Sequence, residues 1–302
     1  MKRINRFFTI FIAVVVIGLI LFTSGQSRTT TITAGVIPQA GSARSQNTEK
    51  SEQALVSKTS TENIFVNVNT SNTDYGVIEI STNIETTSNL KVKVSLNSET
   101  LYYDIESIDT RAIPLQMGNG TYAISIFKNI SGDEYKQIYS TKVEAEIDNS
   151  NTVFLNSNAI VNYDESGIIR DLAYKFERKS GKTAQLEAVY KYVVANIDYD
   201  YTKYDTLKSD YIPNVEDILS LQKGICYDYS AVTASILRQM GIPTKLVMGY
   251  RVDSEIYHAW NEVYINGQWQ VMDTTLDSSE KGFLTKSTMF KDSDLYVADK
   301  FF

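Results

Sequence analysis

The sequence contains one cysteine, Cys226, and one histidine, His258, among 302 residues. A single thiol excludes any disulfide within the chain, and one cysteine with one histidine cannot assemble a Cys/His metal cluster. We therefore expect neither a bound metal nor another cofactor. The lone thiol is either an inert core residue or a reactive one.

The chain also lacks an excess of basic residues. Lys and Arg number 29 against 36 Asp and Glu, which gives a formal net charge of −7. Three of the basic residues lie in the first 26 positions, where there is no acid, so the remainder is more acidic still. An acidic body argues against electrostatic binding to nucleic acid or to anionic lipid. Hydrophobic residues make up 43% of the chain, which excludes wholesale disorder.

No charged residue occurs between Arg6 and Arg28, and residues 7–22 form a nearly continuous apolar run. A basic flank followed by such a run is typical of a secretory signal. The run is long for a signal peptide and short for a full membrane span. Residues 1–26 are therefore predicted to be a signal peptide or a signal anchor. The rest of the chain is then expected to be secreted or to lie on the extracellular face of the plasma membrane, attached to it if the segment is not cleaved.

Residues 27–60 contain no aromatic residue, but six Ser and six Thr. Such a composition cannot bury enough surface to fold, so a flexible Ser/Thr-rich linker is predicted.

Residues 61–150 show hydrophobic alternation with a period of two, which is typical of half-buried strands. The clearest alternating positions are Ile64, Val66, Val68, Leu90, Val92, Val94, Leu96, Tyr122, Ile124 and Ile126. About seven short strands predict an antiparallel, immunoglobulin-like β-sandwich. Residues 118–122 resemble the turn that opens a late strand in bacterial modules of that kind. Because no catalytic residue types cluster here, we expect a spacer or adhesion module.

After residue 150 the hydrophobic period changes to that of a helix. Apolar residues from Leu186 to Ile197 follow one helix face, a short helix is predicted at about 215–222, and a third begins near Cys226 and ends before Gly241-Ile242-Pro243. Strands are predicted at 244–250, 257–265 and 269–273, and Tyr199, Tyr201 and Tyr204 fall in a stretch expected to be extended. Residues 151–302 are therefore predicted to form an α+β domain.

The Asn-Gly pair at 266–267 predicts a two-residue hairpin loop and so sets a strand register. Extended along both strands, this register places Trp260 opposite Asp273 and His258 opposite Thr275. His258 and Trp260 share a face, and Asp273 lies diagonally across from His258. We therefore expect the Asp273 carboxylate to accept a hydrogen bond from the His258 ring and to fix its tautomer.

Cys226 follows Gly224 and Ile225 at the predicted start of a helix. Free backbone N–H groups and the helix dipole favour a thiolate there, and a nearby histidine would act as general base and acid. The Cys226 N–H is suited to bind an oxyanion, and Gly224 would let a substrate approach closely. Alone, such a cysteine is usually a small buried hydrophobe. The sole cysteine, the sole histidine and Asp273 together indicate a catalytic triad.

Three segments resemble the motifs of the transglutaminase-like superfamily. Gly-Ile-Cys-Tyr-Asp-Tyr-Ser at 224–230 looks like its cysteine motif, Tyr-His-Ala-Trp-Asn-Glu-Val-Tyr at 257–264 like its histidine motif, and residues 267–275 like its aspartate motif. The resemblance covers roughly residues 180–285, and the three motifs in this order and spacing are highly specific.

The resemblance implies a papain-like α+β fold with Cys226 as nucleophile, His258 as base and Asp273 as orienting residue. Tyr227 and Trp260 match motif positions and are expected to be walls of the site. Asp228 is expected to cap the helix or to interact with its dipole. No calcium loop of the EF-hand type occurs, so the calcium dependence of the animal enzymes is not expected.

Members of this superfamily attack a carboxamide or peptide carbonyl and pass through a thioester, which water or an amine resolves. The resemblance thus implies an exported thiol enzyme acting on a protein or peptide substrate, including one associated with the cell wall, as a protease, amidase or protein-glutamine acyltransferase. One alternative is a non-catalytic surface binding or adhesion module on the same scaffold, against which an intact triad argues. Another is a thiol peptidase that cuts peptidoglycan, although the motifs fit the transglutaminase-like family better.

Overall fold

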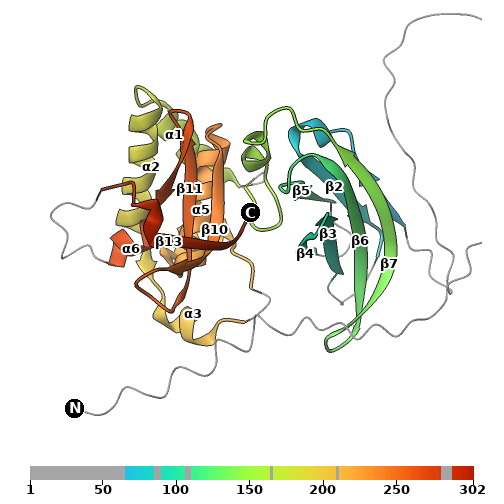
Figure 1. The fold of residues 1–302 in the computed structure, drawn as a ribbon. Coiled ribbons are helices and arrows are strands. Elements are labelled where there is room, and N and C mark those ends of the chain that lie inside the picture. The colour runs from blue at the N-terminus through green and yellow to red at the C-terminus, as the bar shows by residue number, and fades with distance from the viewer. Residues whose placement is uncertain (1–64, 85–89, 106–109, 164–165, 209–210, 280–287) are drawn as a thin grey trace, which may run out of the picture. The chain divides into compact units, whose positions relative to one another are not determined.

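The computed structural model describes residues 65–84, 90–105, 110–163, 166–208, 211–279 and 288–302 (Figure 1). All of them belong to one compact unit, Glu49–Phe302. The predicted signal or anchor segment, residues 1–26, and the predicted linker, residues 27–60, lie outside the described residues. Within the described ranges, no helix is both long enough and apolar enough to cross a membrane.

The region before residue 146 is rich in strands and forms two antiparallel sheets. Their strand orders are β1-β2-β5 and β4-β3-β6-β7. The strands are β1 Val66–Asn69, β2 Val77–Thr82, β3 Leu90–Leu96, β4 Glu99–Ile105, β5 Thr110–Pro114, β6 Gly120–Ser131 and β7 Glu134–Ala145, and a 3₁₀ turn lies at Thr73–Tyr75.

The predicted alternation in this region is confirmed. In β3 every second residue, from Leu90 to Leu96, is buried. Buried side chains from both sheets, such as Ile80 in β2 and Ile124 in β6, belong to one hydrophobic core. Each sheet therefore turns one face toward this core, as expected for antiparallel sheets with polar residues between the apolar ones.

The region after residue 150 combines helices with a four-stranded sheet of order β12-β11-β10-β13, so the α+β prediction is confirmed. The helices are α1 Gly167–Glu177, α2 Lys182–Asn196, α3 Tyr201–Thr206, α4 Val215–Leu221, α5 Cys226–Gln239 and α6 Thr274–Ser279. The sheet strands are β10 Thr244–Arg251, β11 Tyr257–Ile265, β12 Gln268–Met272 and β13 Tyr296–Phe301. A short parallel pair, β8 Asp198–Tyr199 and β9 Lys223–Gly224, precedes α5, and 3₁₀ turns lie at Thr152–Leu155 and Ser293–Leu295.

Helix α5 is the central element of this region. It packs against α1 and α2 as well as against β10 and β11 (Figure 1). Its residues 228–238 are all buried. It ends as predicted, because Gly241 takes a positive φ of 67° and the Ile242 N–H donates to the Leu237 carbonyl at 2.9 Å. Such burial fixes the position of Cys226 at the start of the helix.

The β11–β12 hairpin has the predicted loop and register. Ile265 pairs with Gln268, and Asn266 and Gly267 both have positive φ, which suits a two-residue turn. The predicted extension of the ladder to Asp273 and Thr275 is wrong, since pairing ends at Met272. The chain turns there into α6.

A second correction concerns the tyrosine-rich stretch after α2. The prediction of an extended segment is wrong beyond Tyr199, because α3 begins at Tyr201. The Asp200 side chain accepts a hydrogen bond from the Lys203 N–H at 2.9 Å. This N-cap contact favours a helical turn over the strand that the alternating tyrosines indicate.

Candidate active site

Cys226 is the first residue of helix α5 and is partly exposed. The short parallel pair of β8 and β9 leads into it, with Tyr199 opposite Gly224. The first backbone N–H groups of a helix have no intrahelical partner, and the dipole is positive at this end. The thiol therefore lies in an environment that favours negative charge.

Asp228, in the first turn of α5, caps the helix as expected. Its Oδ2 accepts a hydrogen bond from the Ile225 N–H at 2.9 Å, and the side chain is fully buried. A Cβ atom at position 224 would lie 2.6 Å from the Asp228 Cβ. This cap alone is enough to require glycine at 224, and the approach of a substrate at this glycine stays a prediction.

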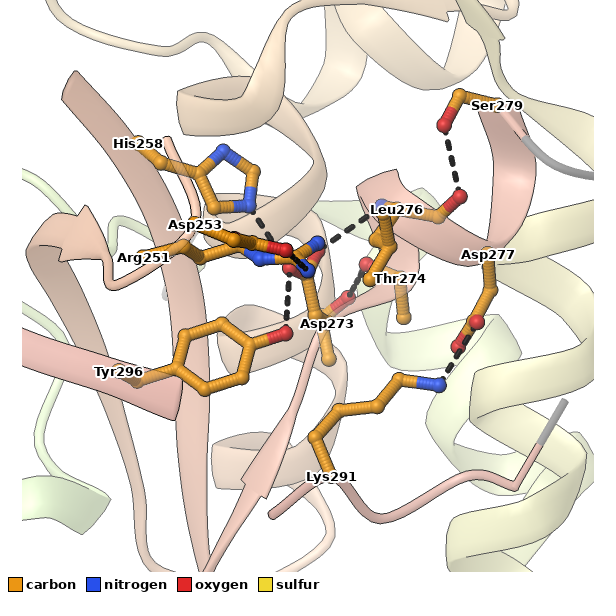
Figure 2. A network of polar contacts seen from close by, with 11 residues as sticks. Arg251, Asp253, His258, Asp273, Thr274, Leu276, Asp277, Ser279, Lys291 and Tyr296 are labelled. Atoms are coloured by element: carbon orange, nitrogen blue, oxygen red, sulfur yellow. Dashed lines mark hydrogen bonds and ion pairs between the residues drawn. The ribbon is translucent and has the colours of Figure 1, made fainter. Parts of the chain in front are cut away.

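His258 lies in strand β11 and contacts the predicted partner. Its Nε2 is 2.8 Å from Oδ2 of Asp273, as Figure 2 shows. The ring also interacts with Cys226, and this interaction raises the pKa of His258. Because Nε2 faces Asp273, Nδ1 is the nitrogen left for the thiol. The structure therefore brings together the only cysteine, the only histidine and the predicted carboxylate.

The environment of His258 favours its charged form. Burial opposes a charge on the ring, but hydrogen bonds with Asp273 and Cys226, and their negative charges, outweigh it and raise the pKa of His258 to about 10. A pKa in that range leaves the imidazolium protonated at neutral pH. A protonated ring beside the thiol stabilises a thiolate.

Asp273 follows directly after β12 and is fully buried. Burial alone would raise the pKa of Asp273, yet hydrogen bonds from His258, the Leu276 N–H and the Tyr296 hydroxyl, and the positive charge of His258, lower it. The Leu276 N–H donates to Oδ1 at 2.9 Å and the Tyr296 hydroxyl to Oδ2 at 3.0 Å. Both carboxylate oxygens are therefore held by the protein (Figure 2).

The two residues expected as site walls have different surroundings. Trp260 is 1% exposed, and its ring stacks on that of His258 with a centroid distance of 6.3 Å. It supports the imidazole from within the protein and so has almost no surface for a substrate to touch. Tyr227 is partly buried and meets the Tyr211 ring edge-on at 6.3 Å.

Three tyrosines beside the site were not predicted to take part in it. Burial and the negative charge of Cys226 raise the pKa values of Tyr199 and Tyr204. Tyr296 reaches Asp273 from the last strand. The run of tyrosines before α4 is a sequence signal that could have pointed to Tyr199 and Tyr204. For Tyr296 the sequence offers no such signal, because its place depends on its pairing with Arg251 in a distant strand.

Comparison with known proteins shows a family resemblance for part of the chain. The model of the transglutaminase-like superfamily matches residues 170–274. A UPF0252 protein of Methanocaldococcus jannaschii is 30% identical over 146 residues, which cover 45% of this chain and 40% of that protein. Kyphoscoliosis peptidase of Homo sapiens is 26% identical over 122 residues, covering 37% of this chain and 18% of the peptidase.

A solved structure, the periplasmic domain of TgpA from Pseudomonas aeruginosa bound to ethylmercury, superposes with a TM-score of 0.33 and 16% identity over 68% of this chain and 74% of that one. The chain spans less than half the length of the two curated relatives.

Proposed function

We propose that the transglutaminase-like domain of this chain, residues 170–274, is a thiol enzyme that attacks amide carbonyls of a protein or peptide substrate. The superfamily contains cysteine proteases and acyltransferases. One observation carries the proposal: His258 forms a hydrogen bond with Asp273, and its interactions with both Asp273 and Cys226 raise its pKa. In this arrangement Cys226 is the nucleophile, His258 the acid and base, and Asp273 the orienting residue.

The first half of the reaction forms a thioester. The Cys226 sulfur bonds to the carbonyl carbon, the carbon–nitrogen bond breaks, and the leaving nitrogen takes the proton from the His258 imidazolium. The positively charged ring that the raised pKa of His258 provides is the required proton donor. The Cys226 backbone N–H, at the start of α5, is placed to donate to the oxyanion of the tetrahedral intermediate.

The second half releases the acyl group. Water or a primary amine attacks the thioester carbon, gives its proton to His258, and the carbon–sulfur bond breaks to restore the thiolate. Water yields a carboxylic acid, so the protein would be a protease or amidase. An amine yields a new amide, so the protein would be a protein-glutamine acyltransferase. Both reactions use the same three residues.

The test uses residues Glu49–Phe302, which form one compact unit. The fragment is incubated with a glutamine-rich protein and a labelled primary amine, and cleavage, deamidation and amine incorporation are read by mass spectrometry. Incorporation that disappears in Cys226→Ala identifies a transferase, and cleavage or deamidation without incorporation identifies a hydrolase. Products that persist in Cys226→Ala would contradict the proposal. The alternative, a non-catalytic binding module, predicts that Cys226→Ala retains every function of the wild type in cells.

We also propose that this domain acts outside the cytoplasm, at the cell surface or after secretion. The support is the basic flank and apolar run of residues 1–22 and the Ser/Thr-rich segment that follows. A substrate associated with the cell wall would be accessible there. Cell fractionation with determination of the mature N-terminus tests both export and cleavage, and an intact chain found in the cytoplasm would contradict export.

The strand-rich region before residue 146 is proposed to be an immunoglobulin-like spacer. Supporting it, the Tyr122 hydroxyl near the start of β6 donates to the Gly118 carbonyl at 2.6 Å and to the Leu115 carbonyl at 2.9 Å. A tyrosine near the start of a late strand that bonds to the backbone a few residues upstream is typical of such sandwiches.

A further inference from the structure

Two donors share one oxygen of the buried carboxylate. Oδ2 of Asp273 lies 2.8 Å from His258 Nε2 and accepts the Tyr296 hydroxyl at 3.0 Å. Oδ1 accepts the Leu276 N–H at 2.9 Å. With a backbone donor on one oxygen and a phenol on the other, the carboxylate group is fixed in orientation from both sides (Figure 2).

The Tyr296 ring is itself held in place. Tyr296 pairs with Arg251 in the β10–β13 ladder, and the Arg251 guanidinium lies over the ring at 5.7 Å from its centroid. The Trp260 ring also lies 5.1 Å from the Tyr296 ring, and Trp260 stacks on His258. The phenol hydroxyl therefore meets Asp273 from a packed position, so that little side-chain entropy is lost in forming this hydrogen bond.

The hydroxyl stays a donor over the whole pH range in which such a site works. Burial and the negative charge of Asp273 raise the pKa of Tyr296, so the phenol remains protonated. A neutral donor stabilises the Asp273 carboxylate without adding a charge that would compete with the His258 imidazolium. A fully buried carboxylate without such partners would be costly.

We propose that Tyr296 is a positioning residue of this site, whose hydroxyl holds Asp273 so that Oδ2 faces His258. Strand β13 thereby completes a site whose other residues come from α5, β11 and the end of β12. The role deepens the proposed thiol chemistry and rests on it. Tyr296 acts through Asp273 and touches no reacting atom.

The test compares Tyr296→Phe with Tyr264→Phe in the Glu49–Phe302 unit. Phenylalanine keeps the ring between Arg251 and Trp260 and removes only the hydroxyl. Tyr264, on β11, packs on Trp269 with a centroid distance of 5.3 Å and makes no contact with Asp273 among the described interactions. Thermal unfolding of both variants checks that each is folded.

His258 is the only histidine, so its ring N–H signals in NMR spectra are unambiguous. In Tyr296→Phe we expect the proton on Nε2 of His258 to exchange faster with water. We also expect acylation of Cys226 to slow about tenfold with KM unchanged, because one hydrogen bond to a charged group is lost. Tyr264→Phe should match the wild type in both. Wild-type exchange and wild-type rate in a folded Tyr296→Phe variant would overturn the inference.

The two proposals fail in different ways. Activity that survives Cys226→Ala refutes the thiol mechanism, and the NMR measurement alone then decides whether Tyr296 holds the Asp273–His258 pair. Activity that is lost in Cys226→Ala but unchanged in Tyr296→Phe refutes only the positioning role.

Discussion

The ammonium group of Lys203 lies 2.8 Å from the fully buried carboxylate of Asp228, two residues after the proposed nucleophile. The same carboxylate accepts hydrogen bonds from the Ile225 N–H and, at 2.5 Å, from the Tyr211 hydroxyl. Helix α3 and the segment before α4 are thereby tied to the start of α5. The position of Cys226 depends on this polar cluster as well as on apolar packing.

Replacing Lys203 by methionine should therefore destabilise the fold. The change leaves Asp228 buried without its counter-charge, and removing one partner of such a pair costs about 3 kcal/mol. Chemical denaturation measures the loss. Lys208→Met, at an exposed position two residues beyond α3, is the matched control and should change the free energy of unfolding by less than about 0.5 kcal/mol. Equal stability of the two variants would contradict the prediction.

His258 should titrate far above an ordinary histidine. Its pKa is raised from 6.5 to about 10, so the single histidine signal in NMR spectra should show an imidazolium at pH 7. In Asp273→Asn, which removes the carboxylate charge, the midpoint should fall. A wild-type midpoint near 6.5 would show that the hydrogen bonds with Asp273 and Cys226 are absent in solution.

The same shift predicts how stability depends on pH. Between pH 6.5 and about 10 the folded state keeps a proton that the unfolded state has released. The contribution of His258 is therefore complete below pH 6.5 and is lost as the pH rises toward 10, by at most about 1.4 kcal/mol per pH unit. Denaturation of wild type and His258→Gln across this range measures it, and parallel curves would contradict it.

Gly224→Ala should weaken both the fold and the activity. The new Cβ would lie 2.6 Å from the Asp228 Cβ, an atom fixed to the helix backbone, so the start of α5 must shift. We expect a loss of about 1–3 kcal/mol in the free energy of unfolding, as for overpacking, and slower alkylation of Cys226 by iodoacetamide. Gly167→Ala is the control, because a Cβ there has only the Arg170 side chain, at 3.9 Å, within reach. It should be neutral or slightly stabilising.

Much of the site could be predicted because its residues obey local rules. The Asn-Gly turn at 266–267 determines a register over five residue pairs, and His258 and Trp260 then share a face. Glycine and proline at 241–243 end α5. The apolar pattern before them runs back to about Cys226, where the helix begins. For these elements, neighbouring residues carry nearly all of the information.

The errors have two local causes and one long-range cause. The hairpin register predicts a strand through Asp273, but that carboxylate caps the next turn by accepting the Leu276 N–H. The sequence does not reveal that a Cβ at position 224 would clash with Asp228. Tyr296 reaches the site because β13 pairs with β10, some fifty residues earlier in the sequence, and no short pattern encodes that pairing. The predictions for residues 1–60 concern a part of the chain outside the described residues.

Tyr199→Phe should slow the proposed reaction, because Tyr199 lies in the strand beside the segment that leads into the nucleophile. Strand β8 places Tyr199 opposite Gly224, and burial and the charge of Cys226 raise the pKa of the phenol, so that it stays protonated. A donor near the sulfur is suited to stabilise the oxyanion that forms when the thiolate attacks a carbonyl, and losing one such donor costs roughly 100- to 1000-fold in kcat with little change in KM. Tyr201→Phe is the control, since that residue is 70% exposed and its ring contacts Tyr199 at 4.9 Å. If both variants keep the wild-type kcat, the oxyanion is stabilised without Tyr199, and the Cys226 N–H must act with a different partner.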